Sequence, residues 1–441
     1  MTTTPWERFG NGPWSEDTIV PQTPPDTTTC ADMGLPRTLR PVPGDGVVQR
    51  PVSDPAVKHH TLGMRLSEPQ FADARTGEAW FAARRHALDL ALAAVAGSEW
   101  AEHLVLRGSM LLKAWFGEAA REPGDLDFVV VPHTWQLDDE RTDPLLDGIA
   151  RAAEALSREA GSPVRIDAAG AVSDEIWTYD RVPGRRLVLP WTAASEGVPP
   201  GTVQLDFVFN EQLAAPAVRT EVPRHGTGES AVLMAASPAL SLVWKIQWLV
   251  SDHNPEAKDL YDAVLLAEST PLPFELLRDV LYAEGHDADL PGILAAAADA
   301  DWFEFRKDRP GLPGEVEHSA LIRLAVALAP SYAPAEEGAY AQLAAAFEDV
   351  TSFVRDEHEA GGMEAVEEWF AKRSVPALCA VVAVRELLGR DRCTLREAAE
   401  VLLSFRDRRW GAGQGAVRGR PGRPARGGGA AGGGGRRAVR N

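Results

Sequence analysis

Cysteine and long apolar runs are both scarce in this sequence. Of its 441 residues, three are cysteine, Cys30, Cys379 and Cys393. An odd and scattered set excludes a disulfide framework and zinc sites built from paired Cys-x-x-Cys motifs. The longest apolar runs, such as 375–384, span about ten residues, whereas a membrane helix needs about 20. Because the chain also opens without a charged and then apolar leader, we expect a cytoplasmic protein with no membrane contact.

Lysine and net positive charge are scarce as well. Only six of the 45 basic residues are lysine, and 64 acidic residues leave a formal net charge of −19. This balance excludes a simple basic coat protein for nucleic acids. With 25% charged and 45% hydrophobic residues, the composition is that of an ordinary soluble globular protein. The length leaves room for two or three domains.

The two ends of the chain differ in composition from the middle. Residues 1–60 contain ten prolines and little periodic apolar sequence, so we predict a disordered leader. At the other end, residues 411–441 contain 12 glycines, seven arginines and no acidic residue. We predict a disordered Gly/Arg-rich tail over 409–441, which can hold RNA loosely through phosphate attraction.

The predicted secondary structure changes once along the middle of the chain. Over 61–215, helical patterns alternate with short β-type runs, which predicts an α+β core with a mixed sheet. Over 216–408, helix signals dominate and predict a mainly α-helical domain. The expected strands lie at 104–106, 128–131, 187–189 and 203–209, and the expected helix starts lie at Ser237-Pro238, at Asn254-Pro255 and at the capping box that begins at Thr394.

A Gly-Ser turn is the first feature that suggests chemistry. Gly108 and Ser109 separate the apolar run 104–106 from a helical pattern that ends at Gly117. The unpaired N–H groups and the dipole at a helix N-terminus favour an anion, and phosphate is the natural guest. A helix cap without a ligand is the alternative interpretation of this pair alone.

Three aspartates lie in sequence with strand alternation. Asp125 and Asp127 share one face of an extended segment, and a pair of carboxylates suits Mg²⁺. Asp206 lies in the run 203–209, opposite the apolar face. If the two strands are neighbours, the three acids form a cluster that needs divalent cations to offset their repulsion. Otherwise Asp206 is an acid on the wet face of a sheet.

A lysine and two further aspartates lie in the helical half. Lys245 has apolar neighbours on its side of the predicted helix, and Asp259 and Asp262 are i,i+3 neighbours in the next one. A lysine aimed at phosphates and aspartates that accept a proton or orient a hydroxyl would complete a transferase site. The alternative is a snorkelling lysine and a solvated acidic face.

In order and spacing, these segments resemble the AbiEii/AbiGii nucleotidyltransferase toxin family of the DNA polymerase β-like superfamily. The similarity covers about residues 84–268 and includes Arg121, four residues before Asp125. At Arg107 the sequence departs from the family, which commonly has glycine there. The resemblance implies catalytic roles for Asp125, Asp127, Asp206, Lys245, Asp259 and Asp262, metal binding by Asp125, Asp127 and Asp206, and nucleotide binding by Gly108, Ser109, Arg121 and Lys245.

The resemblance also implies a function. It predicts a polymerase β-like core that uses two Mg²⁺ ions to transfer a nucleoside monophosphate from an NTP, with GTP and CTP as candidates. The implied acceptor is an RNA hydroxyl, at the 3′ end of tRNA. The family is associated with type IV toxin–antitoxin pairs and phage defence, so a separately encoded antitoxin protein is the expected partner.

Other functions fit parts of the same pattern. A small-molecule nucleotidyltransferase, similar to enzymes that adenylylate aminoglycosides, has a cationic acceptor that would suit an acidic cleft. A nucleotide-binding regulatory module would have the phosphate turn without transfer. A sugar transferase leaves Ser109 and Lys245 unexplained. RNA binding by so acidic a chain requires local arginines, such as Arg181, Arg185 and Arg186, or the tail.

Overall fold

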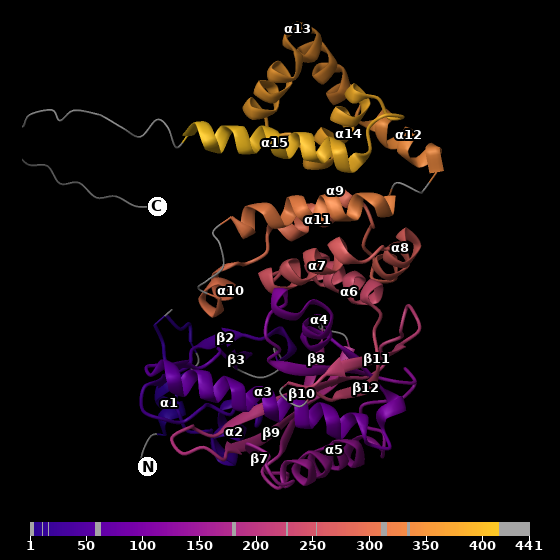
Figure 1. The fold of residues 1–441 in the computed structure, drawn as a ribbon. Helices are drawn as coiled ribbons and strands as arrows, with labels where there is room; N and C mark the ends of the chain where they lie inside the picture. Colours follow the sequence, from indigo (N-terminus) through magenta and orange to yellow (C-terminus); the bar gives the residue numbers. More distant parts are fainter. Residues whose placement is uncertain are drawn as a thin grey trace, which may run out of the picture. The chain divides into compact units, whose positions relative to one another are not determined.

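The computed structural model describes residues 4–10, 12–15, 17–57, 63–178, 182–225, 228–252, 254–309, 315–332 and 336–413. The chain divides into two compact units, residues 1–346 with 376–379, and residues 347–375 with 380–441. The first unit contains a mixed β-sheet and most of the helices (Figure 1). Residues 409–413 of the predicted disordered tail are helical, as the end of helix α15 (Leu395–Gly413), so the prediction is wrong there. The rest of the predicted tail, from residue 414 onward, lies outside the described residues.

An 8-stranded sheet is the framework of the first unit. Its strand order is β11-β12-β5-β6-β10-β9-β7, and β8 pairs with β9. The pairs β12–β5 and β6–β10 are parallel, and the other neighbours are antiparallel, which confirms the predicted α+β class and mixed sheet. The strands are β5 Leu104–Arg107, β6 Asp125–Val130, β7 Val164–Ile166, β8 Val172–Thr178, β9 Val182–Ala193, β10 Gly201–Val208, β11 Val218–Pro223 and β12 Ser230–Ala235.

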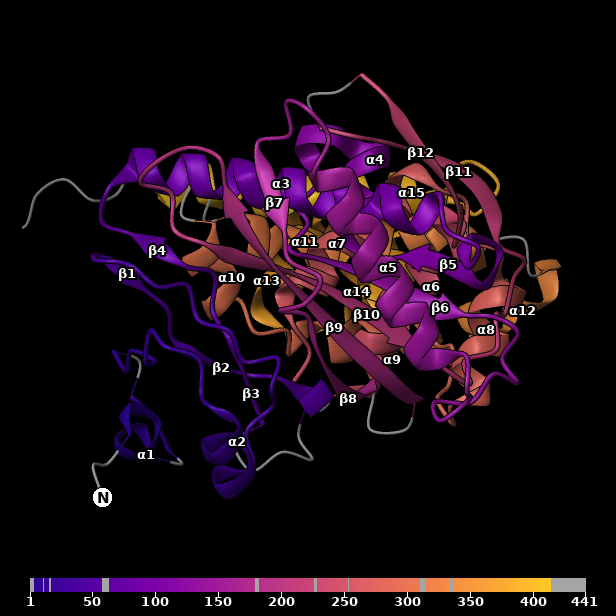
Figure 2. The same cartoon turned by 90° about the horizontal axis from the view of Figure 1, so that it is seen from below.

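One face of the sheet is the main hydrophobic core. Period-two alternation places Leu126, Phe128 and Phe207 on this face, each with no exposed surface. The rings of Phe128 and Phe207 stack with their centroids 5.5 Å apart. Helices α3 (Ala74–Ala96) and α5 (Thr142–Ser157) cover this face, and Figure 2 shows them crossing in front of the strands. The opposite face is therefore free to present polar side chains.

The predicted boundary at residues 215/216 is wrong, because the compact units divide at 346/347 and a further hairpin of the sheet follows residue 216. Strands β11 and β12 lie in the stretch expected to be helical, yet they extend the sheet beyond β5. In β12, exposed Ser230 and Val232 alternate with buried Ala231 and Leu233. The alternation is real, but these small apolar residues give it little contrast in sequence. The sheet therefore ends at Ala235.

Helices follow the sheet, and two of the expected starts fall in this unit. Ser237 caps α6, where its hydroxyl accepts the Leu240 N–H at 3.2 Å, as predicted. The start expected at Asn254-Pro255 is wrong, because Pro255 and Ala257 instead pair with the backbone of Asp301. The helices are α4 Ser109–Phe116, α6 Pro238–Ser251, α7 Ala257–Ser269, α8 Phe274–Ala283, α9 Leu290–Ala298, α10 Phe303–Asp308, α11 Val316–Tyr332 and α12 Glu336–Ala346; short 3₁₀ turns are η2 Ala101–His103 and η3 Gly117–Ala119.

The predicted disordered leader over 1–60 is wrong for its described part. This segment forms a small hydrophobic cluster that includes Trp6, Val20 and Leu39. Its prolines occupy positions that tolerate them, such as Pro5 in the first turn of α1. Figure 2 shows the segment beside the sheet. Its elements are α1 Pro5–Phe9, α2 Thr27–Met33, β1 Val47–Val48, β2 Pro51–Ser53, η1 Pro55–Val57, β3 Met64–Leu66 and β4 Gln70–Phe71.

The second unit is helical. It contains α13 Glu348–Lys372, most of α14 Ala377–Leu388, and α15 Leu395–Gly413. The path of α13 breaks at Gly361 and Gly362, where Gly362 has φ +68°. The predicted capping box is present, since the Thr394 N–H donates to Glu397 at 2.7 Å and the Glu397 N–H donates to Thr394 Oγ1 at 3.2 Å.

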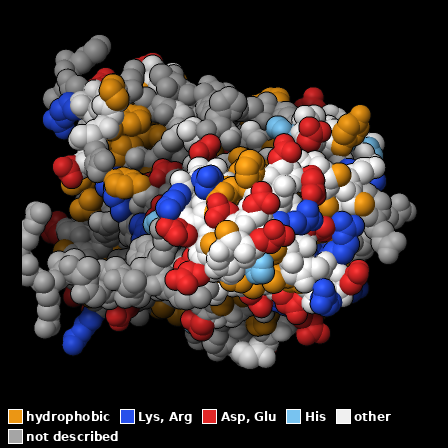
Figure 3. All heavy atoms as spheres, turned by 90° about the horizontal axis from the view of Figure 1, so that it is seen from above, with side chains coloured by type: hydrophobic (Ala, Val, Ile, Leu, Met, Phe, Trp, Pro, Cys, Tyr) orange, Lys and Arg blue, Asp and Glu red, His pale blue; other side chains and the backbone are white. Residues whose placement is uncertain are grey.

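The surface carries both signs of charge. On the face drawn in Figure 3, acidic and basic side chains are interspersed, so neither sign forms one continuous area there. Within the described residues, no helix combines the length and apolar character that crossing a membrane requires.

Candidate active site

The three predicted carboxylates meet on the polar face of the sheet. Strands β6 and β10 are parallel neighbours, and Asp206 lies opposite Asp127 in their register. Because paired residues of parallel strands point to the same face, Asp206 joins Asp127 and Asp125 on one side. The expectation that these two strands are adjacent is therefore confirmed.

The predicted phosphate turn approaches the same carboxylates. Gly108 follows β5 with φ +82°, and a Cβ at this position would lie 2.4 Å from Asp127 Oδ2. Only glycine fits this backbone conformation and this close approach. The next residue, Ser109, begins α4, which ends before Gly117 as predicted. Its hydroxyl is buried and has no hydrogen-bond partner among the described residues, so it has capacity for a ligand or a water molecule.

The crowded carboxylates affect one another's protonation. Burial, together with the charges of Asp125 and Asp206, raises the pKa of Asp127 to about 7, and the nearby Arg107 opposes this shift. Burial also raises the pKa of Asp206, against the opposing effect of Arg186. A bound cation would relieve such repulsion, as expected for a site that binds metal.

Asp206 is held by an arginine that the sequence did not place in the site. Arg186 of β9 lies opposite Asp206 of β10, and its Nε and Nη2 donate to the Asp206 carboxylate at 3.0 and 2.9 Å. Gln204 Nε2 also donates to Asp206, at 3.2 Å. Arg186 is 8% exposed, so it is not the open RNA contact suggested by the sequence. Arg185 donates to Ser173 Oγ at 2.6 Å, and Arg181 lies outside the described residues.

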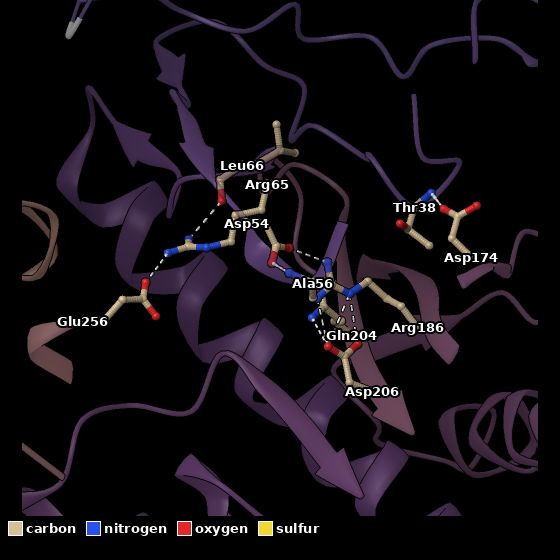
Figure 4. Close-up of polar contacts among 10 residues, drawn as sticks. All are labelled: Thr38, Asp54, Ala56, Arg65, Leu66, Asp174, Arg186, Gln204, Asp206 and Glu256. Atoms are coloured by element: carbon tan, nitrogen blue, oxygen red, sulfur yellow. Dashed lines mark hydrogen bonds and ion pairs between the residues drawn. The ribbon is translucent and has the colours of Figure 1, made fainter. Parts of the chain in front are cut away.

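A second unexpected residue completes this ion-pair group. Arg186 Nη1 donates to Asp54 Oδ2 at 2.8 Å, so one guanidinium bridges two carboxylates (Figure 4). Burial acts to raise the pKa of Asp54, but Arg186 outweighs this effect and lowers it. Local sequence gives no signal for this contact, because Asp54 and Arg186 are 132 residues apart and the segment around Asp54 is rich in proline.

Lys245, Asp259 and Asp262 come together as buried ion pairs. Lys245 Nζ lies 2.7 Å from Asp259 Oδ1 and 2.9 Å from Asp262 Oδ2. Arg121 Nε donates to the same Asp262 oxygen at 3.2 Å. Burial would lower the pKa of Lys245, but the two aspartates raise it, so the lysine is charged. The helices α6 and α7 thus fix a cation and its counterions at the edge of the site.

A cleft of about 1100 Å³ joins these groups. Gly108 and the three clustered carboxylates line it, whereas the buried Ser109 and Asp262 side chains are not part of its wall. Arginines and lysines line the cleft in nearly the same number as carboxylates, despite the net charge of the chain. The remaining predicted residues in its wall are Arg121, Lys245 and Asp259.

Comparison with known proteins identifies the family. The model of the nucleotidyl transferase AbiEii toxin family, type IV toxin–antitoxin system, matches residues 90–354, more than half of the chain. The chain belongs to this family. No curated protein matches it. Among solved structures, the AbiEii chain is similar to MenT4, a nucleotidyltransferase toxin from Mycobacterium tuberculosis H37Rv, with 19% identity over 58% of this chain and 85% of that one, at a TM-score of 0.38.

The family assignment confirms the resemblance and the enzyme class. The AbiEii chain is a nucleotidyltransferase toxin of a type IV toxin–antitoxin system. Its departure at Arg107 has a local explanation, since the guanidinium lies 2.8 Å from Glu211 and over the rings of Trp244 and Trp248. The arginine thus packs against α6 beside the turn.

The donor set of the AbiEii chain suits a hard divalent cation in part. Asp125 and Asp127 present carboxylate oxygens on one face at the cleft wall, which are the ligands that Mg²⁺ prefers. Asp206 differs, because Arg186 already donates to both of its oxygens. In the part of the chain that the structure describes, no three His, Cys, Asp or Glu residues form a ready metal-binding group. Asp206 fits such a cation only as a carboxylate shared with Arg186.

Proposed function

We propose that this AbiEii chain transfers a nucleoside monophosphate from an NTP to the 3′ end of an RNA, with tRNA as the acceptor. The observation that carries this proposal is the in-register placement of Asp206 beside Asp127, on the face that Gly108 approaches. GTP and CTP are the candidate triphosphates, and the cytoplasm, where these substrates are found, is the proposed compartment. Phage defence with a cognate antitoxin protein as partner is the proposed biological role.

The reaction is an in-line displacement at the α-phosphorus. The acceptor hydroxyl oxygen forms a bond to phosphorus, and the bond from phosphorus to the bridging oxygen of the β-phosphate breaks. Pyrophosphate leaves with that electron pair, and the hydroxyl proton passes to water. The turn at Gly108 offers backbone N–H groups to the phosphates at the start of α4. Lys245 and Arg121 stand at the cleft wall, where their charges stabilise the leaving pyrophosphate.

The proposed cofactor is a pair of Mg²⁺ ions. Asp125 and Asp127 are the proposed ligands, joined by Asp206 when its carboxylate is shared between Arg186 and the cation. Bound divalent cations supply charge compensation on the reacting phosphates and make the attacking hydroxyl more acidic. The protein orients the carboxylates by strand register and supplies the fixed positive charges around them.

The cleft composition favours a phosphate-bearing acceptor over an aminoglycoside. A polycationic acceptor would require an acidic cleft, but cations balance carboxylates in its wall. Arg84 and Arg40 lie on this wall as well, and Arg84 is paired with Glu68 at 2.6 Å. The net charge of −19 therefore does not describe the cleft itself.

A labelling experiment tests the proposed function. The protein is incubated with one α-labelled NTP at a time, Mg²⁺, and either total RNA, purified tRNA or an aminoglycoside. We expect label on tRNA for one preferred triphosphate and none after EDTA treatment. Asp127→Asn should reduce incorporation by at least about 10³-fold, because the variant loses a charged ligand while keeping its shape.

Asp147→Asn is the matched control, since this aspartate is 72% exposed on α5. It should transfer label at the wild-type rate. Full activity of Asp127→Asn, with circular dichroism and melting temperature unchanged, would contradict the assignment. Label on the aminoglycoside alone would indicate a small-molecule nucleotidyltransferase instead of an enzyme that acts on RNA.

A further inference from the structure

The N-terminal segment forms part of the active-site cleft, although it precedes the matched family region. Asp54, Arg65 and Glu68 line the cleft, whereas the family match begins at residue 90. The segment is tied to the rest of the unit by several contacts. Arg37 Nη2 donates to the Ser173 carbonyl at 2.6 Å, and the Thr38 N–H donates to Asp174 at 2.6 Å. The segment is therefore a fixed wall of the cleft.

Asp54 is held in one orientation within this wall. It lies between β2 and η1, and its backbone N–H donates to the Gly63 carbonyl at 3.0 Å. Its Oδ1 accepts the Ala56 N–H at 3.0 Å, which directs Oδ2 at Arg186. Figure 4 shows Arg186 between the two carboxylates. Asp54 is 6% exposed, so its contact with Arg186 is little screened by water.

Because Asp54 and Asp206 share the charge of Arg186, Asp54 affects the charge of the cation site. One guanidinium charge faces two carboxylates, Asp54 and Asp206, so the group as a whole keeps one negative charge. If Arg186 had Asp206 as its only counterion, that pair would be neutral and would attract a cation weakly. With Asp54 present, the guanidinium charge is divided between two carboxylates, so Asp206 keeps part of its negative charge.

We propose that Asp54 is a positioning residue for the cation site, which acts through Arg186 to keep Asp206 available to Mg²⁺. The proposal rests on the proposed function, since it names a residue that supports the same cations. The N-terminal segment, which precedes residue 90, would then support the cation site through Asp54 in addition to contributing to the fold.

Mg²⁺ binding to the full chain without nucleotide, measured by calorimetry, tests the proposal. We expect Asp54→Asn to weaken Mg²⁺ affinity by about tenfold, as substitutions of residues that support metal ligands do. In the labelling assay, this variant should need more Mg²⁺ for half-maximal rate, while the rate at saturating Mg²⁺ stays close to that of the wild type. A purely structural role would instead lower the saturated rate.

Asp174→Asn is the matched control. Asp174 is also buried and also anchors the N-terminal segment, through Thr38, but its ion pair is with Arg37. Its substitution should leave Mg²⁺ affinity within about twofold of wild type. In an Arg186→Gln background, Asp54→Asn should likewise change affinity by less than about twofold, because its route of action is gone. The comparison of Asp54→Asn with Asp174→Asn decides the matter even where Arg186→Gln does not fold.

The possible results separate this proposal from the proposed function. Wild-type transfer that depends on Mg²⁺ and on Asp127, combined with wild-type Mg²⁺ affinity in Asp54→Asn, overturns the role of Asp54 alone. Equal losses of affinity in Asp54→Asn and Asp174→Asn overturn it too, because they trace the effect to a loosened segment. A wild-type protein that neither binds Mg²⁺ nor transfers label overturns both proposals.

Discussion

At the scale of single residues, the site is a set of charges that are paired before any substrate arrives. Arg186 serves Asp206 and Asp54, and Lys245 serves Asp259 and Asp262. Fixed pairs of this kind need little reorganisation when charge develops on the phosphates. The resemblance assigned Asp259 and Asp262 to the acceptor side; their contacts support a positioning role toward Lys245.

Asp262 provides a prediction about stability. It has no exposed surface and two cationic partners, Lys245 and Arg121. Asp262→Asn should lower the free energy of unfolding at pH 7 by about 3 kcal/mol, because two buried cations lose a counterion. Urea denaturation of both proteins measures this difference.

The same residue predicts a pH dependence. Burial acts to raise the pKa of Asp262, but Arg121 and Lys245 outweigh it and lower the pKa below its ordinary value. The contribution of Asp262 to stability is therefore complete above the unfolded-state pKa, near pH 4, and is lost as the pH falls through the lower folded-state pKa. The difference in free energy of unfolding between wild type and Asp262→Asn should stay constant from pH 5 to about 8 and become smaller at lower pH. A difference in free energy of unfolding that grows at acid pH would contradict the lowered pKa of Asp262.

At the scale of elements, two strands and two helices carry the site. The parallel pairing of β6 with β10 sets the spacing of the carboxylates, and α6 with α7 brings Lys245 to Asp259 and Asp262. The strands and α6 can be predicted from the sequence, since alternation indicates the strands and Ser237 indicates the start of α6. The pairing partner of each strand cannot be predicted in this way, because it depends on contacts between distant segments.

The cap of α6 gives an element-scale prediction. The Ser237 hydroxyl accepts the Leu240 N–H, so Ser237→Ala should lower the free energy of unfolding by about 1 kcal/mol. Because α6 is anchored by buried apolar residues on several sides, Lys245 should stay in place and the transfer rate should be unchanged. Urea denaturation and the labelling assay measure the two effects. A large loss of activity with wild-type stability would show that the cap region has a further role.

At the scale of the whole molecule, the uneven distribution of charged residues explains how so acidic a chain can act on RNA. The net charge is −19, yet the cleft is balanced and the face in Figure 3 mixes both signs. The seven arginines after residue 413 are the largest cationic block in the sequence. RNA association should therefore depend on this block more than on the acidic remainder.

Truncation after Gly413 tests that expectation. Loss of these arginines should weaken RNA binding at low salt by about tenfold and flatten the dependence of affinity on salt, because fewer counterions are released. Fluorescence anisotropy with labelled tRNA across a salt series measures both. Transfer to saturating RNA should continue, since the cleft residues lie between Pro36 and Arg309. Equal affinity and equal salt dependence for the two proteins would rule out a role for the tail.

The sequence by itself determined the local features of this protein. Alternation placed Asp125 and Asp127 on one face, the Gly-Ser turn marked the start of α4, and the order of the motifs indicated the family. Each of these depends on residues a few positions apart, where propensity, capping and periodicity act.

Only the tertiary structure decided which groups meet. It joined Asp206 to Arg186 and Arg186 to Asp54, extended the sheet to β11 and β12, and built a proline-rich N-terminal segment into the cleft wall. The physical reason is that strand register and the burial of ion pairs depend on the whole packed unit. A proline-rich segment can be ordered by its own hydrophobic cluster together with the surface against which it packs.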